Sequence, residues 1–374
     1  MKKLWLLTFV CVVSAAFCIG GASGADFCVV PNGSGETSLQ GALTEAQSNN
    51  EADIIKVVQG TYNGNFTYYS SQGYGVTLEG GWATGCSVRE VSPTNTILDG
   101  LNSGRSLSII QITNGGDVEV DGFTIQNGND PGSGGGVHAS STANSGTAGN
   151  ILLANNNIKD NTISTYQGGG VYAASDADDT AYAGTVTIIN NIIAGNSASG
   201  ALSTGGGVHA SSTSESFSGE TVTLLNNTIT GNTAEKYGGG LYIYTDDNTH
   251  NIFNNIIWGN SAETGWDIAF NYTIGGSTEN GFFNDYSDIY PSDPWDNEID
   301  NIDADPRLNT NHHLKPSSPC IDAGTNGIPN SPSTDIDGDD RIIDGDKNDA
   351  AITDIGADEY VPRGLISFLM LLLN

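Results

Sequence analysis

The sequence predicts an all-β solenoid, a fold in which short strands stack in successive coils, and two recurring patterns carry this prediction. A glycine triplet followed by an apolar residue and then a ring occurs four times, as "GGGVHASS" (134–141), "GGGVYAAS" (168–175), "GGGVHASS" (205–212) and "GGGLYIYT" (238–245). Strand-like segments with paired asparagines recur in step with it, as "LLANNNIKDN" (152–161), "TIINNIIAGN" (187–196), "TLLNNTITGN" (223–232) and "IFNNIIWGN" (252–260). A period near 35 residues, built from short strands rather than helices, is typical of a β-solenoid.

Each period predicts one coil of three strands. Segments such as "TVTII" (185–189) alternate apolar and polar residues as strands do, the asparagine pair supplies a bend, and extended chain resumes after it. The glycine triplet then leads into a third short strand. Successive coils should stack at about 4.8 Å and place equivalent residues over one another.

The equivalent asparagines should therefore form ladders of hydrogen-bonded amides inside the solenoid. The first ladder is expected at Asn156, Asn191, Asn227 and Asn255, and a second at Asn161, Asn196, Asn232 and Asn260. Ligand contact is the alternative, but recurrence at a bend favours a structural role. The glycine triplets fit a corner that needs positive φ and close approach of neighbouring coils.

Weaker coils continue the pattern upstream, over residues 53–128. Before them, residues 37–50 show helical spacing of apolar residues, with Thr37 or Ser38 as the N-cap. A short helix at this point would cover the open first coil and block edge-to-edge pairing of its strands.

The first 25 residues indicate export. Lys2 and Lys3 precede an apolar stretch, and small residues follow at 22–25, as in a secretory signal. In the oxidising compartment that this implies, Cys28 and Cys86 are expected to form a disulfide. Cys320 remains unpaired, either as a thiol nucleophile or as a buried, inert cysteine.

The charge balance excludes one class of partner. The 374 residues include 12 Lys and Arg against 43 Asp and Glu, a net charge of −31. Such a surface repels phosphate backbones, so no nucleic acid is expected as a partner, whereas divalent cations are suitable ones.

Several segments carry a resemblance to known families. "DIIKVVQGTYNGN" (53–65), "LEGGW" (78–82), "TILDG" (96–100) and "VDGFTIQNG" (120–128) resemble early coils of the right-handed parallel β-helix, or pectate-lyase-like, superfamily. The glycine and asparagine repeats are similar to those of polymorphic outer-membrane proteins. "NIDADPRL" (301–308), "HHLKPSSPCIDAG" (312–324) and "TDIGADEY" (353–360) resemble the choice-of-anchor Q domain of secreted bacterial β-helix proteins.

This resemblance implies a right-handed parallel β-helix of three-strand coils with an N-terminal capping helix and an irregular acidic C-terminal region. The expected organisation is a signal peptide (1–25), a cap and first coil (26–75), the β-helix (76–290), the choice-of-anchor Q-like region (291–361) and a hydrophobic tail (362–374). The tail is too short to span a membrane, so no transmembrane helix is expected in the mature chain. It is the stub of a sorting anchor, or a strand or helix packed on the last coil.

The fold does not imply an activity, because the same solenoid carries lyases, hydrolases, esterases and inert surface proteins. Between residues 110 and 300 the only Lys or Arg side chains are Lys159 and Lys236, neither with acidic neighbours on the strands of its own coil. We therefore expect a secreted or surface-attached bacterial scaffold, an adhesin-like or glycan-binding protein without identified catalytic residues. The alternatives are a polysaccharide lyase or glycoside hydrolase with an unrecognised site, and a structural matrix protein.

Two sets of residues are candidate binding sites. Asp335, Asp337, Asp339 and Asp346 approximate the ligand spacing of a calcium loop, although Asp340 stands where glycine is expected. A solvated cluster, or one paired with Arg341, is the alternative to Ca²⁺.

The second set is the column of rings that follow the glycines. His138, Tyr172, His209 and Tyr242 lie between two inward-facing columns, so they should face outward as one external stack on which sugars can bind. The alternative is that the rings only cover the sheet.

Overall fold

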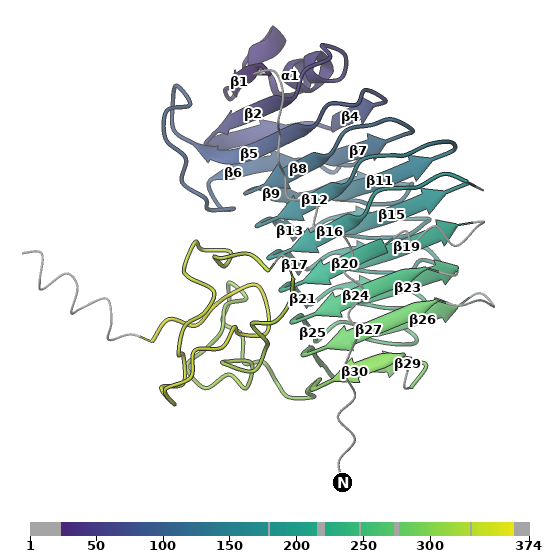
Figure 1. The fold of residues 1–374 in the computed structure, drawn as a ribbon, viewed down its shortest axis with the longest axis vertical. Helices are drawn as coiled ribbons and strands as arrows, with labels where there is room; N and C mark the ends of the chain where they lie inside the picture. The colour runs from purple at the N-terminus through teal and green to yellow at the C-terminus, as the bar shows by residue number, and fades with distance from the viewer. Residues whose placement is uncertain are drawn as a thin grey trace, which may run out of the picture.

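The computed structural model describes residues 24–178, 180–214, 221–246, 248–272, 277–292, 294–329 and 331–362. These residues form a right-handed parallel β-helix with an irregular C-terminal region at its side (Figure 1). The expected signal peptide and hydrophobic tail lie outside the described residues, except for residues 24, 25 and 362. In the part of the chain that is described, no helix combines the length and the apolar character needed to cross a bilayer.

Four parallel sheets run along the solenoid axis. Sheet 1 contains β1 (Asp26–Val29), β2 (Asp53–Val58), β5 (Val76–Trp82), β8 (Val118–Asp121), β12 (Ile151–Ala154), β16 (Val186–Ile189), β20 (Thr221–Leu225), β24 (Thr249–Phe253), β27 (Thr278–Phe282) and β30 (Asn297–Ile299). Sheet 2 contains β3 (Gly60–Asn63), β6 (Thr96–Asp99), β9 (Thr124–Gln126), β13 (Asn157–Lys159), β17 (Ile192–Ala194), β21 (Thr228–Thr230), β25 (Ile256–Trp258) and β28 (Asp285–Tyr286). Sheet 3 contains β4 (Phe66–Ser70), β7 (Leu107–Gln111), β11 (Val137–Ala143), β15 (Val171–Ala177), β19 (Val208–Ser214), β23 (Leu241–Asp246), β26 (Ile268–Tyr272) and β29 (Ile289–Tyr290). The short sheet 4, between sheets 2 and 3 along the chain, contains β10 (Asn129–Asp130), β14 (Thr162–Ile163), β18 (Ser197–Ala198) and β22 (Thr233–Ala234).

The core is a stack of equivalent apolar residues. In β16, Val186 and Ile188 are buried while Thr187 is partly exposed, and each pairs in register with its equivalent on β20. The solenoid extends beyond the expected boundary at residue 290, because β30 still pairs with β27. That boundary prediction is wrong, since the last coil is short and lies outside the regular 35-residue spacing.

A helix and a disulfide close the N-terminal end. Helix α1 (Leu39–Ala46) follows a short 3₁₀ turn, η1 (Gly35–Thr37), and begins at Ser38, whose side chain accepts a hydrogen bond from the Gly41 amide. The helix is shorter than the expected 37–50. It ends at Ala46 with Gln47 as its C-cap, and the residues that follow are polar and supply no apolar face to bury. Its apolar face is buried beside β1, β2 and β4.

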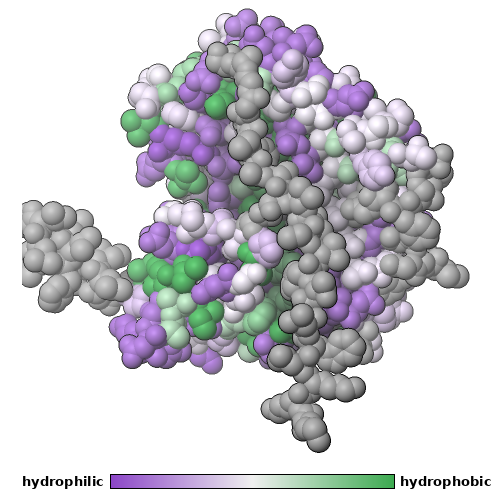
Figure 2. Space-filling model, in the orientation of Figure 1, coloured by the Kyte–Doolittle hydropathy of each residue, from purple (hydrophilic) through white to green (hydrophobic). Residues whose placement is uncertain are grey.

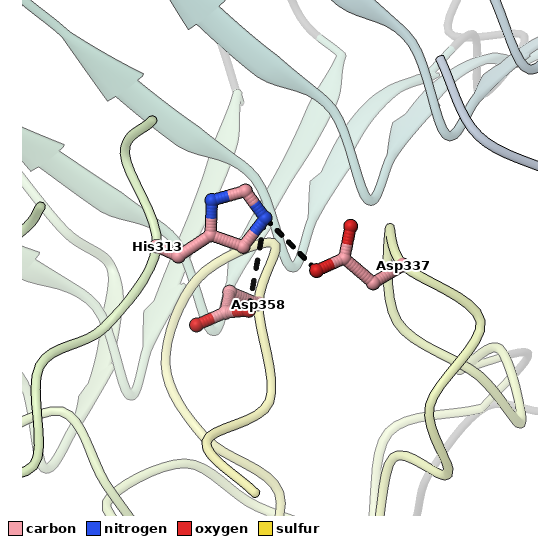
Figure 3. A group of neighbouring side chains, drawn as sticks. All are labelled: His313, Asp337 and Asp358. Carbon is pink, nitrogen blue, oxygen red and sulfur yellow. Dashed lines mark ion pairs between the residues drawn. The ribbon is translucent and has the colours of Figure 1, made fainter. Parts of the chain in front are cut away.

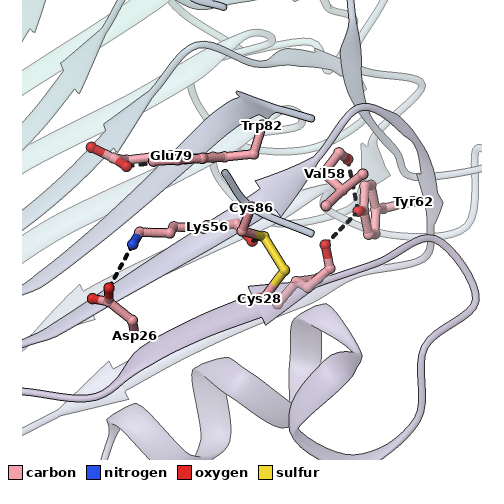
Figure 4. Close-up of a disulfide and its surroundings, with 9 residues drawn as sticks. Asp26, Cys28, Lys56, Val58, Tyr62, Glu79, Trp82 and Cys86 are labelled. Carbon is pink, nitrogen blue, oxygen red and sulfur yellow. Dashed lines mark hydrogen bonds and ion pairs between the residues drawn. A yellow bond between two sulfur atoms is a disulfide. The ribbon is translucent and has the colours of Figure 1, made fainter. Parts of the chain in front are cut away.

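The Cys28–Cys86 disulfide ties β1 to the loop after β5 (Figure 4). It closes a loop of 58 residues, which stabilises the fold by about 4 kcal/mol in the chain-entropy model. Nearby, the Tyr62 hydroxyl lies within hydrogen-bond distance of the carbonyls of Val29 and Val58, which links the first two strands of sheet 1 to β3.

The first asparagine ladder runs through the bend between sheets 1 and 2. The Oδ1 atom of Asn191 accepts hydrogen bonds from the backbone amide and the side-chain amide of Asn156, at 2.8 and 3.1 Å. The same pattern recurs from Asn191 to Asn227 and from Asn227 to Asn255. It continues to Asn284 and Asn301, two members that the sequence repeat does not reveal because the last two spacings are 29 and 17 residues.

The second ladder explains the glycine triplets. Asn161, Asn196, Asn232 and Asn260 stack in the same way, and the ladder ends on the Asp267 carboxylate. The third glycine of each triplet lies against it: a Cβ atom on Gly136 would be 2.6 Å from the side-chain nitrogen of Asn161. The first glycine has positive φ, 74° at Gly134, so the triplet is needed for both turn geometry and close approach.

An outer column of asparagines holds the C-terminal region. Asn155, Asn190, Asn226 and Asn254 precede the inner ladder residues and have φ between 53 and 55°. The side chain of Asn190 donates to the Thr334 carbonyl and accepts from Arg341, and Asn254 exchanges hydrogen bonds with the backbone of Thr325. These bonds fix Thr325, Thr334 and Arg341 against the bend of the solenoid.

Apolar contacts complete this docking. Ile336 and Ala357 pack on Ile192 and Ala194 of β17, while Leu314, Cys320 and Ile355 pack on Ile256 of β25. The C-terminal region therefore covers the outer face of sheet 2 at β17 and β25. On the face drawn in Figure 2, apolar residues also remain at the surface of this region.

Replacing Asn227 by Leu should lower the free energy of unfolding by roughly 1–3 kcal/mol. The Asn227 amide bonds to Asn191, Asn255 and the Ile188 carbonyl, so the change leaves buried polar groups without partners in two coils. Urea denaturation followed by circular dichroism measures the difference. Asn144→Leu, in an exposed loop, is the matched control, and equal losses in the two variants would contradict a stabilising ladder.

Candidate functional site

The four rings that follow the glycines form one continuous stack. Strand register places His138 beside Tyr172, Tyr172 beside His209 and His209 beside Tyr242. Their ring centroids are 4.9, 5.4 and 5.0 Å apart in that order. These distances match the spacing between strands, so each ring lies against the ring of the next coil.

The expectation that all four rings form an open platform is wrong. His209 and Tyr242 are only 4% and 7% exposed, and His138 and Tyr172 are partly buried. The ring faces are occupied by neighbouring rings, and the edges contact the adjoining turns. His209 Nδ1 lies 2.9 Å from the Thr204 hydroxyl, and His138 Nδ1 lies 3.2 Å from the Ser133 carbonyl.

Burial also keeps the stack uncharged. It lowers the pKa of His138 to about 4, with the charge of Arg105 adding to the effect. It lowers the pKa of His209 to about 3, with a smaller contribution from His250. Burial and Asp176 raise the pKa of Tyr172 to about 12. Near neutral pH the rings are therefore neutral and their stacking carries no charge repulsion.

The most exposed of the stacked rings lies at the C-terminal end of the stack. Ala269 follows Tyr242 in register and Tyr290 follows Ala269, so the outward column continues for two more coils. Tyr237 fills the gap that Ala269 leaves, with its ring centroid 6.3 Å from Tyr242 and 6.5 Å from Tyr290. Tyr290 is 49% exposed and Tyr237 is partly exposed.

Two charged side chains border these tyrosines. Lys236 Nζ lies 5.5 Å from the centroid of the Tyr237 ring and 2.7 Å from a carboxylate oxygen of Glu263. We call Lys236, Tyr237, Glu263 and Tyr290 the open aromatic end. The sequence repeat does not reveal this end, because Tyr237 precedes a glycine triplet and Tyr290 lies beyond the last one. The tyrosine directly before "GGG" was the available signal.

The four aspartates expected to bind Ca²⁺ do not converge. Asp335 is buried, and its oxygens accept hydrogen bonds from the amides of Asp337, Asp339 and Glu359. The chain turns back sharply at Gly338, φ 87°, instead of following the longer path of a calcium loop. Asp346 lies in another group, with Asp322 and Asp344. The prediction that these four aspartates form a single metal site is therefore wrong.

The alternative in which Arg341 pairs with these aspartates also needs correction. The Arg341 side chain is fully buried, and its ion pair is with Glu359, at 3.6 Å. It also donates to the carbonyls of Gly356 and Ala357 and to the side chain of Asn190. Arg341 thus joins the C-terminal region to the solenoid.

Cys320 is a packing residue. It is buried, and its sulfur lies 3.2 Å from Asp285 Oδ2. Burial, followed by the charge of Asp285, raises the pKa of the Cys320 thiol well above its usual value. A protonated, inaccessible thiol cannot act as a nucleophile.

One further concave feature lies in the C-terminal region. A cavity of about 420 Å³ is lined by residues that include Asn326, Pro332, Arg341 and Thr353. Of these residues, Arg341 also bonds to Asn190 and to the carbonyls of Gly356 and Ala357. The comparisons with family models, curated proteins and solved structures found no match for the chain.

The stability contributed by the buried, neutral His209 should be lost on acidification. The pKa of His209 is about 3 in the folded state against 6.5 in the unfolded chain, so between these values only the unfolded chain takes up the proton. Stability contributed by neutral His209 is present above pH 6.5 and is lost progressively as the pH falls toward 3. The contribution of His209 to the free energy of unfolding should therefore fall by about 3 kcal/mol between about pH 7.5 and about pH 4.5, while buried carboxyl groups with raised pKa values, such as Asp285 and Asp335, act in the opposite direction.

Urea denaturation at the two pH values measures this effect. On going from the higher to the lower pH, His209→Gln should gain stability relative to the wild type, because the effect of the other titrating groups cancels in the comparison. Thr204→Val, which removes the hydrogen-bond partner but keeps the imidazole, should show no such gain. An unchanged pH dependence in His209→Gln would show that this histidine is protonated without cost.

Proposed function

We propose that the protein is a secreted or surface-attached bacterial scaffold that binds glycans at the open aromatic end. The single observation that carries this proposal is that a stack of six neighbouring rings ends at the exposed Tyr290 beside the partly exposed Tyr237. An exposed aromatic face with polar edges is suited to the apolar face of a sugar ring, whose hydroxyl groups can bond to side chains at the rim.

The charges at the rim favour neutral sugars. Lys236 is paired with Glu263, so it offers no free cation to a sugar carboxylate or sulfate. The net charge of the chain, −31, repels anionic polymers as a whole. Neutral polysaccharides or cell-surface glycans are therefore the ligands that this surface fits best.

The fold supports the scaffold role. The interior is filled by apolar stacks and by asparagine ladders whose amides bond to one another, which makes the solenoid a rigid support for an exposed surface. The Cys28–Cys86 disulfide suits an oxidising compartment, in agreement with the signal-like N-terminal sequence.

The Tyr237→Ala/Tyr290→Ala double variant should lose glycan binding by about tenfold or more, because two ring faces are removed from the contact. A glycan array that contains neutral and acidic polymers measures binding, and thermal melting checks the fold. Tyr69→Ala/Tyr182→Ala is the matched control, since these tyrosines are comparably exposed, at 48% and 56%, on other coils.

Two results would reject the proposal, and two others would support an alternative. Wild-type protein could bind no glycan, or the double variant could bind as well as the control. New reducing ends or unsaturated products during incubation would instead support the alternative of a polysaccharide-active enzyme. Ordered self-assembly of the purified protein without glycan binding would support the matrix-protein alternative.

A further inference from the structure

Three separate segments of the C-terminal region bring a histidine and two aspartates together. His313 Nε2 lies 3.0 Å from Asp337 Oδ2 and 4.0 Å from Asp358 Oδ1 (Figure 3). One potential ligand atom from each residue lies within 4.8 Å of the other two. The residues are 24 and 21 positions apart in the sequence, so tertiary packing creates the cluster.

The orientation of the imidazole is set by its other nitrogen. His313 Nδ1 lies 2.9 Å from the carbonyl oxygen of Asn311, the geometry of an Nδ1–H donor. Nε2 faces the two carboxylates and donates to Asp337 while it carries a proton, so a metal ion would replace that proton. The hydrogen bond from Nδ1, the distal nitrogen, to a carbonyl is the usual support of a metal-binding histidine.

Each of the two aspartates is fixed by a hydrogen bond to a residue outside the cluster. Asp358 Oδ2 accepts a hydrogen bond of 2.7 Å from the Leu314 amide, which leaves Oδ1 toward the histidine. The backbone amide of Asp337 donates to Asp335 Oδ1, so the turn that carries Asp337 is fixed. The side chains of His313 and Asp358 are 22% and 10% exposed, whereas that of Asp337 is 52% exposed. The cluster is thus mostly buried at His313 and Asp358 and open to solvent at Asp337.

A hydrogen bond from His313 accounts for only part of this geometry. A protonated His313 could donate to Asp337 at 3.0 Å, but Asp358 Oδ1 at 4.0 Å is beyond hydrogen-bond distance. Two ligand atoms, each about 2.1 Å from a metal ion, are about 3 to 3.5 Å apart at bond angles between 90 and 110°. A cation would therefore engage all three groups after a small inward movement of Asp358.

We propose that His313, Asp337 and Asp358 form a binding site for a divalent transition-metal ion of the zinc type. One imidazole and two carboxylates suit Zn²⁺, whereas Ca²⁺ and Mg²⁺ take oxygen ligands and gain nothing from an imidazole. Three protein ligands leave a fourth position for water on the side where Asp337 is exposed. This site differs in both residues and metal class from a calcium loop, and it does not depend on glycan binding.

The test is a zinc titration of the metal-stripped, full mature protein against a chromophoric chelator. The wild type should bind one Zn²⁺ per chain, and His313→Gln, Asp337→Asn and Asp358→Asn should each weaken binding by at least about 100-fold, since losing a direct ligand exceeds the usual effect of an outer-shell change. Asp346→Asn, in the separate acidic group, and His312→Gln, the adjacent imidazole, are the matched controls and should bind as the wild type does.

A second readout identifies the ligand directly. Zinc should shift the ¹⁵N resonance of His313 Nε2 and raise the melting temperature, and an excess of Ca²⁺ or Mg²⁺ should do neither. No zinc binding by the wild type, equal binding by the three ligand variants, or displacement of zinc by Ca²⁺ would overturn the proposal. If Asp358→Asn fails to fold, the other two variants decide the result, because Asp337 and His313 are more exposed.

Discussion

The stacking register of the asparagine ladders is the constraint on which the rest of this structure depends. Each ladder amide bonds to its equivalent in the next coil, and a shift of one residue would leave buried amides in both coils without partners. The third glycine of each triplet is tied to the same register, because any side chain at Gly136 or Gly240 would collide with a ladder asparagine. The ladders therefore fix the positions of all other columns, inside and outside the solenoid.

Two outer features follow from this register. The left-handed asparagine before each of the first four members of the inner ladder projects an outer amide, and Asn190 and Asn254 use theirs to hold the C-terminal region against sheet 2. On sheet 3, the register stacks His138, Tyr172, His209 and Tyr242 at a spacing that suits ring contact. Because the column changes from rings to Ala269, a residue outside the column, Tyr237, completes the stack and leads it to the surface.

Features that repeat along the chain could be predicted from the sequence. Features that depend on single tertiary contacts could not. The period and the alternation around the glycines were sufficient for the ladder at Asn156–Asn255 and for the outward direction of the ring column. They could not show that the rings cover one another, since exposure depends on rotamers and on adjoining turns such as Thr204 beside His209. The spacing of Asp335 and Asp337 suggested a shared ion, but backbone amides occupy the oxygens of Asp335.

The contrast between the two parts of the molecule explains where each kind of site can arise. In a parallel solenoid, a side chain meets chiefly its equivalents in the coils above and below, so amides stack on amides and rings on rings. Such columns provide extended surfaces of one chemical character, as polymer recognition requires. A mixed set of donors needs unlike residues from distant segments, and the C-terminal region is where the chain supplies them: His313, Asp337 and Asp358 approach from three loops that pack on the solenoid without repeating. The regular coils thus act as the rigid base on which an irregular region can assemble a site that repetition itself cannot build.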